Sequence, residues 1–196
     1  MGLATRSAIA AATAAVTNRF VASTNMINGA YAIANASPAW AGACNVTVTH
    51  TAVGANDTLG TITVVGTDLA GQVRTEVIVP VAGGTATGVV PFRTITSITG
   101  AGWVINAGND TIVVGHAAGM ICSGSSGTLF GSVVQVTAAS TVVYADATGT
   151  ILTQPASYPI GEHMLTPGID FSGFLKVTTT GANDIVVVHT PHQAGA

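Results

Sequence analysis

The sequence predicts an all-β protein, built as an antiparallel β-sandwich or jelly-roll-like module or modules behind an N-terminal, partly helical extended arm. Three observations lead to this fold class. After Gly42 the chain forms short runs rich in Val, Ile and Thr, and Gly, Asn and Asp separate these runs. Several runs alternate apolar and polar residues with the period of two that a half-buried strand requires. The first forty residues differ, because they are rich in alanine, the best helix former.

The N-terminal assembly arm is expected to span residues 1–42. Its first half is Ala-rich, which favours a helix, and Gly29 and Pro38 end any long helix in the stretch that follows. An Ala-rich arm with few charges has little reason to stay ordered in water unless it packs on something. We therefore expect another subunit to cover it. Phe20 and Trp40 are the candidate intersubunit contacts, since large aromatic side chains dominate such interfaces.

Candidate strands follow the arm in two sets. The first β unit, residues 43–118, holds the candidate strands 45–50, 61–66, 73–79, 88–92, 94–99, 103–105 and 111–115. The second β unit, residues 119–196, holds the candidate strands 119–122, 133–137, 141–144, 148–152, 174–179 and 184–189. The second unit either stands beside the first or packs with it into one sandwich.

The run 73–79 shows the alternation most clearly. Its two faces carry Val73, Val77 and Val79 on one side and Arg74, Glu76 and Ile78 on the other. We expect the valine face to lie in the core and the charged residues to lie on the outer face, each with a cross-strand partner.

A short turn motif recurs at 54–57, 108–110 and 181–184. In each case a Gly is followed by Asn-Asp, and a β-prone stretch comes next. Asn, Asp and Gly accept left-handed backbone conformations and bond their own main chain, so the motif is typical of turns that enter strands. The stretches at 111–116 and 185–189 also resemble each other, as TIVVGH and IVVVH. The unequal separations argue against a solenoid or propeller with a fixed repeat, and either two related β units or one sandwich of two similar halves fits better.

Composition indicates a subunit of an assembly. Only 7% of the residues are charged and 48% are hydrophobic, with a mean hydropathy of +0.57. Soluble domains carry about 25% charged residues, so a free monomer would have little charge to keep it apart from its neighbours. We expect a symmetric homo-oligomer, with a trimer as the preferred state.

Charge and hydropathy also limit the partners. The net charge of −3 and the single lysine provide no cationic stripe for phosphates, so we expect no direct nucleic-acid binding. Thr, Ser, Asn and Gly interrupt every apolar stretch well short of a spanning helix, so we expect no membrane partner.

Three linked motifs occupy residues 61–98. They are TITVVGTDLAGQVRTEVI at 61–78, the Gly/Thr-rich turn GGTATG at 83–88 and FRTITSI at 92–98. This block resembles one in virion structural proteins of tailed bacteriophages, where a TITVTGTD-x-x-G-x-x-x-TE-x-I hairpin precedes a Gly/Thr-rich turn and an F-[KR]-T-[IV]-T-S-[IV] strand. The resemblance covers roughly residues 43–116 and implies a component of a phage particle.

Within that class the resemblance implies a non-enzymatic structural protein located in the virion. We favour a capsid decoration, or cement, protein, because a small β domain with an interlocking arm suits the clamping of neighbouring capsomers. A neck or tail-associated subunit is the near alternative. The partners would be copies of itself and the major capsid protein or other virion proteins, held by buried apolar area and by strand pairing across subunits.

The alternative from another class is a receptor- or carbohydrate-binding module of a fibre or spike. Such a module needs exposed aromatic side chains grouped on one surface with polar partners. Tyr144, Tyr158 and Phe171 are the candidates for that group.

No pattern in the chain predicts a catalytic, cofactor or metal site, and we expect neither an enzyme nor a cofactor. His189 and His192 lie close in sequence, but no third ligand has a recognisable metal-site spacing. Glu162 and His163 adjoin in the Pro/Gly-rich loop 155–168, where neighbouring residues of an extended chain point opposite ways.

We expect three isolated aspartates and the two cysteines to have structural roles. Asp57, Asp110 and Asp184 each lack the acidic companions of a calcium loop and are interpreted as turn residues. Cys44 and Cys122 lack a CxxC or zinc-type spacing, so they are either two small buried thiols or one disulfide that links the halves of the chain.

Overall fold

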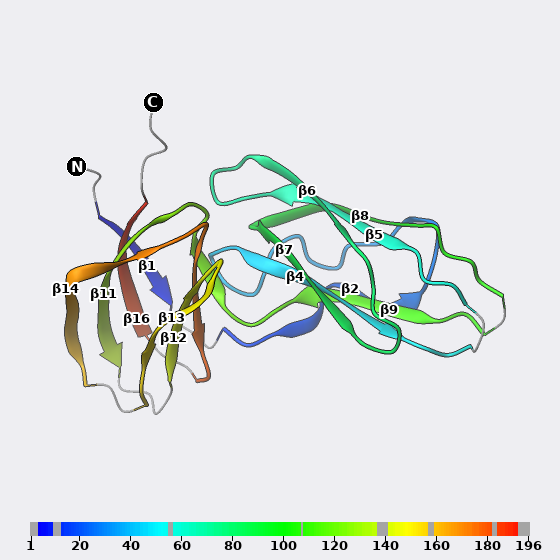
Figure 1. Ribbon diagram of the computed structural model, residues 1–196. Coiled ribbons are helices and arrows are strands. Elements are labelled where there is room, and N and C mark those ends of the chain that lie inside the picture. The colour runs from blue at the N-terminus through cyan, green and yellow to red at the C-terminus, as the bar shows by residue number, and fades with distance from the viewer. Residues whose placement is uncertain are drawn as a thin grey trace. The chain divides into compact units, whose positions relative to one another are not determined.

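The computed structural model describes residues 4–9, 13–54, 57–106, 108–136, 141–156, 159–181 and 184–191. These residues form strands and connecting loops, and the all-β class is confirmed for them. In this part of the chain no helix is long and apolar enough to cross a membrane. The chain divides into a continuous unit, Ala15–Ala118, and a split unit made of Met1–Ala14 and Gly119–Ala196 (Figure 1).

The continuous unit contains two four-stranded antiparallel sheets, ordered β2-β9-β4-β7 and β3-β8-β5-β6. Their strands are β2 (Val16–Asn25), β3 (Gly29–Ala30), β4 (Cys44–Thr51), β5 (Thr61–Thr67), β6 (Val73–Ile78), β7 (Thr85–Phe92), β8 (Thr94–Ala101) and β9 (Thr111–His116). Both sheets contribute to one core, whose fully buried members include Phe20, Val46, Ile62, Phe92 and Ile98.

The split unit also contains two four-stranded antiparallel sheets, ordered β1-β16-β11-β14 and β10-β15-β12-β13. Their strands are β1 (Thr5–Ile9), β10 (Met120–Ser123), β11 (Gly127–Val136), β12 (Val142–Asp146), β13 (Gly149–Gln154), β14 (Gly161–Phe171), β15 (Leu175–Thr179) and β16 (Asp184–Pro191). The fully buried side chains of this unit include Leu129, Tyr144, Leu175, Val177 and Val187.

The two units share one strand order. When the strands of each unit are counted along the chain, one sheet reads 1-8-3-6 and the other reads 2-7-4-5, in both units. The similar stretches at 111–116 and 185–189 lie in β9 and β16, which both occupy the eighth position. The chain therefore carries two β units with the same strand order, and they divide between Ala118 and Gly119.

The N-terminal segment is not the expected helical arm. β1 pairs with β16 over five residues and so belongs to the split unit. β2 pairs with β9 and β3 with β8, so residues 16–30 belong to the continuous unit. The helix prediction was wrong because the intrinsic preference of alanine for a helix is weak. It favours a helix, relative to most other residue types, by less than about 1 kcal/mol per residue. Strand pairing and the burial of Phe20 and Val21 outweigh it.

The continuous unit is inserted into the split unit, between the first and second strands of the latter. The chain leaves and re-enters the split unit at neighbouring points, because the Gly119 N–H donates to the Thr13 carbonyl at 2.8 Å. The continuous unit likewise begins and ends at paired positions, Val16 of β2 and His116 of β9. Adjacent ends are the geometry at which one unit tolerates the insertion of another.

Two further expectations about strands were wrong. β14 occupies most of the predicted loop 155–168, and its Pro167 is tolerated because β14 lies at the edge of its sheet. The predicted strand 103–105 is not formed, and Val104 makes only an isolated bridge with Thr58.

Candidate functional site

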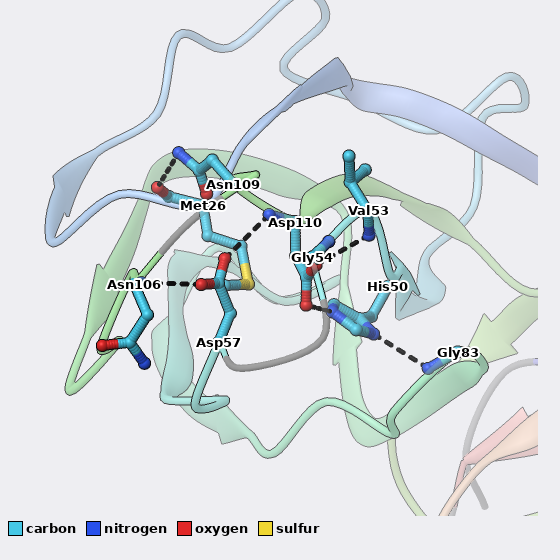
Figure 2. A network of polar contacts seen from close by, with 9 residues as sticks. All are labelled: Met26, His50, Val53, Gly54, Asp57, Gly83, Asn106, Asn109 and Asp110. Atoms are coloured by element: carbon cyan, nitrogen blue, oxygen red, sulfur yellow. Dashed lines mark hydrogen bonds and ion pairs between the residues drawn. The ribbon is translucent and has the colours of Figure 1, made fainter.

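A polar network joins the β2–β3, β4–β5, β6–β7 and β8–β9 loops of the continuous unit (Figure 2). The Asp57 carboxylate accepts the backbone N–H groups of Asn106 at 2.8 Å and Asp110 at 2.9 Å. The Asp110 carbonyl accepts the N–H of Met26 at 2.9 Å, which attaches the β2–β3 loop. The Asp57 carboxylate and the Asp110 carbonyl thus accept main-chain N–H groups that no strand partner satisfies.

Asp110 is the centre of this network. Its carboxylate accepts the N–H groups of Val53 at 2.7 Å and Gly54 at 2.9 Å, and the His50 Nε2 lies 2.8 Å away. The N–H groups of Gly54 and Val53 hold the pKa of Asp110 below its ordinary value, and His50 contributes in the same direction. The side chain therefore stays ionised and bonded at neutral pH.

His50 is fixed in one tautomer. The Gly83 N–H donates to its Nδ1 at 2.8 Å, so Nδ1 carries no proton and the Nε2–H donates to Asp110. Both ring nitrogens of this buried imidazole are occupied within the unit. Although His50 and Asp110 form a pair of the kind found in hydrolases, the ring has no free nitrogen with which to accept a substrate proton.

We expect Asp110→Asn to lower the urea midpoint of unfolding. The amide oxygen can still accept from Val53 and Gly54, but the amide NH2 then faces the Nε2–H of His50, and two donors meet in a buried place. Glu162→Gln, an exposed change in the split unit, is the control and should leave the midpoint unchanged. Equal midpoints for both variants would contradict this account of the network.

Phe20 and Trp40, the predicted intersubunit contacts, meet at His116 inside the continuous unit. The ring centroids of Phe20 and Trp40 lie 6.1 Å and 4.3 Å from that of His116, in edge-on geometry. Phe20 is 0% exposed, so it has no surface left for a second subunit and its proposed contact role was wrong. Trp40 is half-buried, with its Nε1–H donating to the Ala43 carbonyl at 3.1 Å, and its contact role stays a prediction.

His189 occupies the equivalent strand of the split unit. It is buried on β16, its Nε2 lies 3.2 Å from the Ser7 Oγ of β1, and the Phe171 ring lies 6.3 Å away edge-on. The sequence signal for both buried histidines was the repeated IVVxH stretch, which we interpreted as a repeat without assigning its histidines to the core. His192 and the motif residues 55–56 and 182–183 lie outside the described residues.

We expect stability to fall when the pH drops below about 6.5, the ordinary pKa of histidine. Burial lowers the pKa of His116 and His189 in the folded state. The unfolded chain then binds protons that the folded chain does not, and stability declines towards the lower folded pKa values. Asp68, Asp110 and Asp146 also have lowered pKa values, but their contribution is lost only below their ordinary value of 3.8.

Urea unfolding between pH 7.5 and 4.5 measures this histidine effect. Replacing His189 by Gln should reduce the dependence on pH, whereas replacing the exposed and non-titratable Met164 by Gln should leave it unchanged. An unfolding free energy that stays constant across this range would contradict the assignment.

A pocket of about 370 Å³ lies between β13 and β14 of the split unit. Its Gln154 side chain is hydrogen-bonded to Ser132 and Tyr144, and the His163 Nε2 lies 2.7 Å from the Pro159 carbonyl. These polar groups already have partners within the unit. Among the described residues, no three His, Cys, Asp or Glu side chains gather in a way that could hold a metal ion.

The aromatic residues named for a receptor-binding surface do not form one in the described part of the chain. Tyr144 and Phe171 are buried in the split unit, and Tyr158 lies outside the described residues. Cys44 and Cys122 are both free thiols. Burial raises the pKa of each thiol to about 12, which keeps both protonated and poorly reactive at neutral pH.

An exposed apolar surface, here named the valine edge, lies on β6, on β7 and on the loop between them. Its members are between 51% and 78% exposed and comprise Val73, Val77, Val79, Val81 and Val89. The expectation that the valine face of 73–79 is core was wrong: Ile78, on the opposite face, is the buried residue. A period of two identifies the two faces of a strand but not which face turns inward.

The charged residues beside the valine edge have partners within the unit. The Arg74 Nε donates to the Asp68 carboxylate at 2.8 Å, across the β5–β6 hairpin. The Glu76 Oε1 accepts the N–H groups of Val89 at 2.6 Å and Val90 at 3.2 Å. Gly88 allows this approach, since a Cβ there would lie 2.2 Å from the Glu76 Oε2.

The valine edge is the candidate functional site. Exposed apolar side chains on two successive strands and on the loop that joins them are typical of contact surfaces. The polar groups of the network around Asp110 and of the β13–β14 pocket serve to hold loops and strands of their own unit. Comparisons with protein-family models, with curated proteins and with solved structures found no match to this chain.

Proposed function

We propose that this chain is a non-enzymatic structural component of a phage virion, specifically a capsid decoration or cement protein, and that each of its units is a jelly roll. The proposal begins from the strand order. An eight-stranded jelly roll, formed by two Greek keys, has sheets ordered 1-8-3-6 and 2-7-4-5, and both units have these orders. Viral capsid proteins are among the classes that use this architecture.

The same architecture also occurs in lectins and cupins, so the strand order does not select a function. A metal-dependent cupin needs a cluster of metal-ligating side chains, and the described residues contain no such cluster. A lectin needs exposed aromatic and polar groups in one site, and the candidates Tyr144 and Phe171 are buried. The surface that stands exposed, the valine edge, is apolar.

The observation that carries the proposal is the combination of this apolar edge with a chain that is only 7% charged. Contacts made by such a surface gain about 25 cal/mol for each Å² of apolar area that they bury. They depend little on ion pairs, so salt should weaken them little. A protein that holds a shell together by this means acts mechanically, by contact alone.

The test uses phage particles whose genome encodes this chain. After density-gradient purification, mass spectrometry should find the chain in the particles at a copy number similar to that of the capsomers. It should stay bound in about 1 M salt, where the Debye length is about 3 Å. A few copies per particle would assign it to the neck or tail instead, and its absence from particles, or its release by salt, would overturn the proposal.

A further inference from the structure

β6 is an open sheet edge. It pairs only with β5 among the described strands, through six successive residue pairs without a register shift. The edge strand of the opposite sheet, β7, is protected differently: it contains Pro91, its pairing with β4 has a register shift, and the Glu76 carboxylate covers two of its N–H groups. Proteins protect sheet edges with such features, and β6 has neither a proline nor a shift.

The backbone groups on the free side of β6 can be identified. The Asp68 N–H donates to the Gln72 carbonyl at 3.0 Å at the turn of the β5–β6 hairpin, where Gly71 adopts a φ of 77°. Along an antiparallel ladder, hydrogen-bonded and non-hydrogen-bonded pairs alternate. The N–H and C=O groups of alternate residues of β6 therefore face away from β5, and these residues are Val73, Thr75 and Val77.

These outward groups are self-complementary in one register. A two-fold axis at Thr75 places Val73 opposite Val77 of a second copy and Thr75 opposite itself, so that all three outward residues find partners. The same register places Arg74 opposite Glu76, which are opposite charges. A shift of the axis by one residue in either direction instead places Arg74 opposite Arg74 or Glu76 opposite Glu76, and like charges directly opposite each other destabilise a sheet.

The state of Glu76 agrees with this register. Its Oε1 is bonded to β7, while its Oε2 is buried and has no hydrogen-bond partner among the described residues. Arg74 uses its Nε within the unit and its side chain is 54% exposed, so its terminal nitrogens can reach an oxygen on a neighbouring strand. Opposite charges directly across a strand pair stabilise it, so Arg74 of one copy opposite Glu76 of the other favours this register.

We infer that β6 pairs antiparallel with β6 of a second copy of this chain, about a two-fold axis at Thr75. The pairing joins the two β3-β8-β5-β6 sheets into one continuous sheet and brings the two valine edges side by side. It is two-fold, so it gives a dimer in place of the trimer expected above. This inference deepens the proposed function, because it names a second copy of the chain as the partner of the valine edge. Its test does not require phage particles.

Cysteine cross-linking tests the register. Paired residues of a ladder have Cα atoms about 5.5 Å apart when hydrogen-bonded, within the range that a disulfide spans. Under mild oxidation, T75C should therefore cross-link to itself, while V73C and V77C should cross-link when mixed but not alone. The wild-type chain, whose own two thiols are protonated at neutral pH, gives the background. Self-linking of V73C or V77C, or no linking of T75C, would overturn the inference.

Mass measurement in solution tests the pairing itself. The full chain should sediment as a dimer at micromolar concentration. Thr75→Pro removes an N–H that faces away from β5, so it should yield a monomer that keeps its cooperative unfolding, whereas the control Thr75→Val keeps this N–H and should remain dimeric. A wild-type monomer at all concentrations would overturn the inference.

The two proposals can fail separately. A wild-type monomer that is still found in phage particles would contradict the β6 pairing and leave the structural role in place. A dimer with the cross-linking pattern described, absent from particles, would contradict the structural role alone. If Thr75→Pro does not fold, the cross-linking result decides.

Discussion

A chain in which Thr13 is joined to Gly119 through Asn-Gly, with the continuous unit removed, should fold into the split unit, whereas residues 119–196 alone should not. The difference is β1, which covers the edge of β16 over five residue pairs. The Gly119 N–H already donates to the Thr13 carbonyl, which is the hydrogen bond that closes a four-residue β-turn, and Asn and Gly are favoured at the centre of such a turn.

Far-UV circular dichroism and urea unfolding measure this prediction. The joined chain should show a β spectrum and a cooperative transition, and the fragment 119–196 should show neither. The fragment 15–118 is the matched control, because it contains all eight strands of its unit and should unfold cooperatively by itself. Cooperative folding of 119–196 without β1 would show that the N-terminal strand is dispensable.

Phe20→Ala should destabilise the continuous unit by about 3 to 5 kcal/mol, the usual cost of removing a fully buried phenylalanine. Phe20 is 0% exposed and packs against the His116 ring, so its loss leaves a cavity in the core of the continuous unit. Val53→Ala, at a residue that is 62% exposed in the β4–β5 loop, is the control and should change the unfolding free energy by less than about 0.5 kcal/mol.

The same measurement separates a core role of Phe20 from an intersubunit role. A core residue lowers the free energy of unfolding at every protein concentration. A contact residue would instead change the mass in solution and leave the unfolding of the monomer nearly unaltered. The second result would restore Phe20 as a contact between subunits and contradict its place in the core.

Local patterns predicted several individual strands of the fold. The candidate strands 45–50, 61–66 and 111–115 each lie within a strand of the structure, β4, β5 and β9. These features depend on turn residues and on alternation, which a short window of sequence contains.

Long-range pairing could not be predicted in this way. β1 is a strand because β16, about 180 residues away, offers it an edge, and its own composition favours a helix. The network around Asp110 was missed for a related reason: the turn interpretation of Asp57 and Asp110 was sound locally, but their shared loops and His50 meet only in the folded unit. The exposed face of β6 was missed because alternation does not reveal which side of a strand faces solvent.

The insertion of one unit into another fixes an order of events during synthesis. The continuous unit has all its strands once residue 116 has left the ribosome, while β1 must wait for β16, whose His189 lies 182 residues beyond Ser7. At 5–20 residues per second the wait lasts roughly 10 to 40 s. Nascent chains interrupted before β16 therefore carry a folded continuous unit and a split unit that lacks its last strand, which leaves them open to proteolysis.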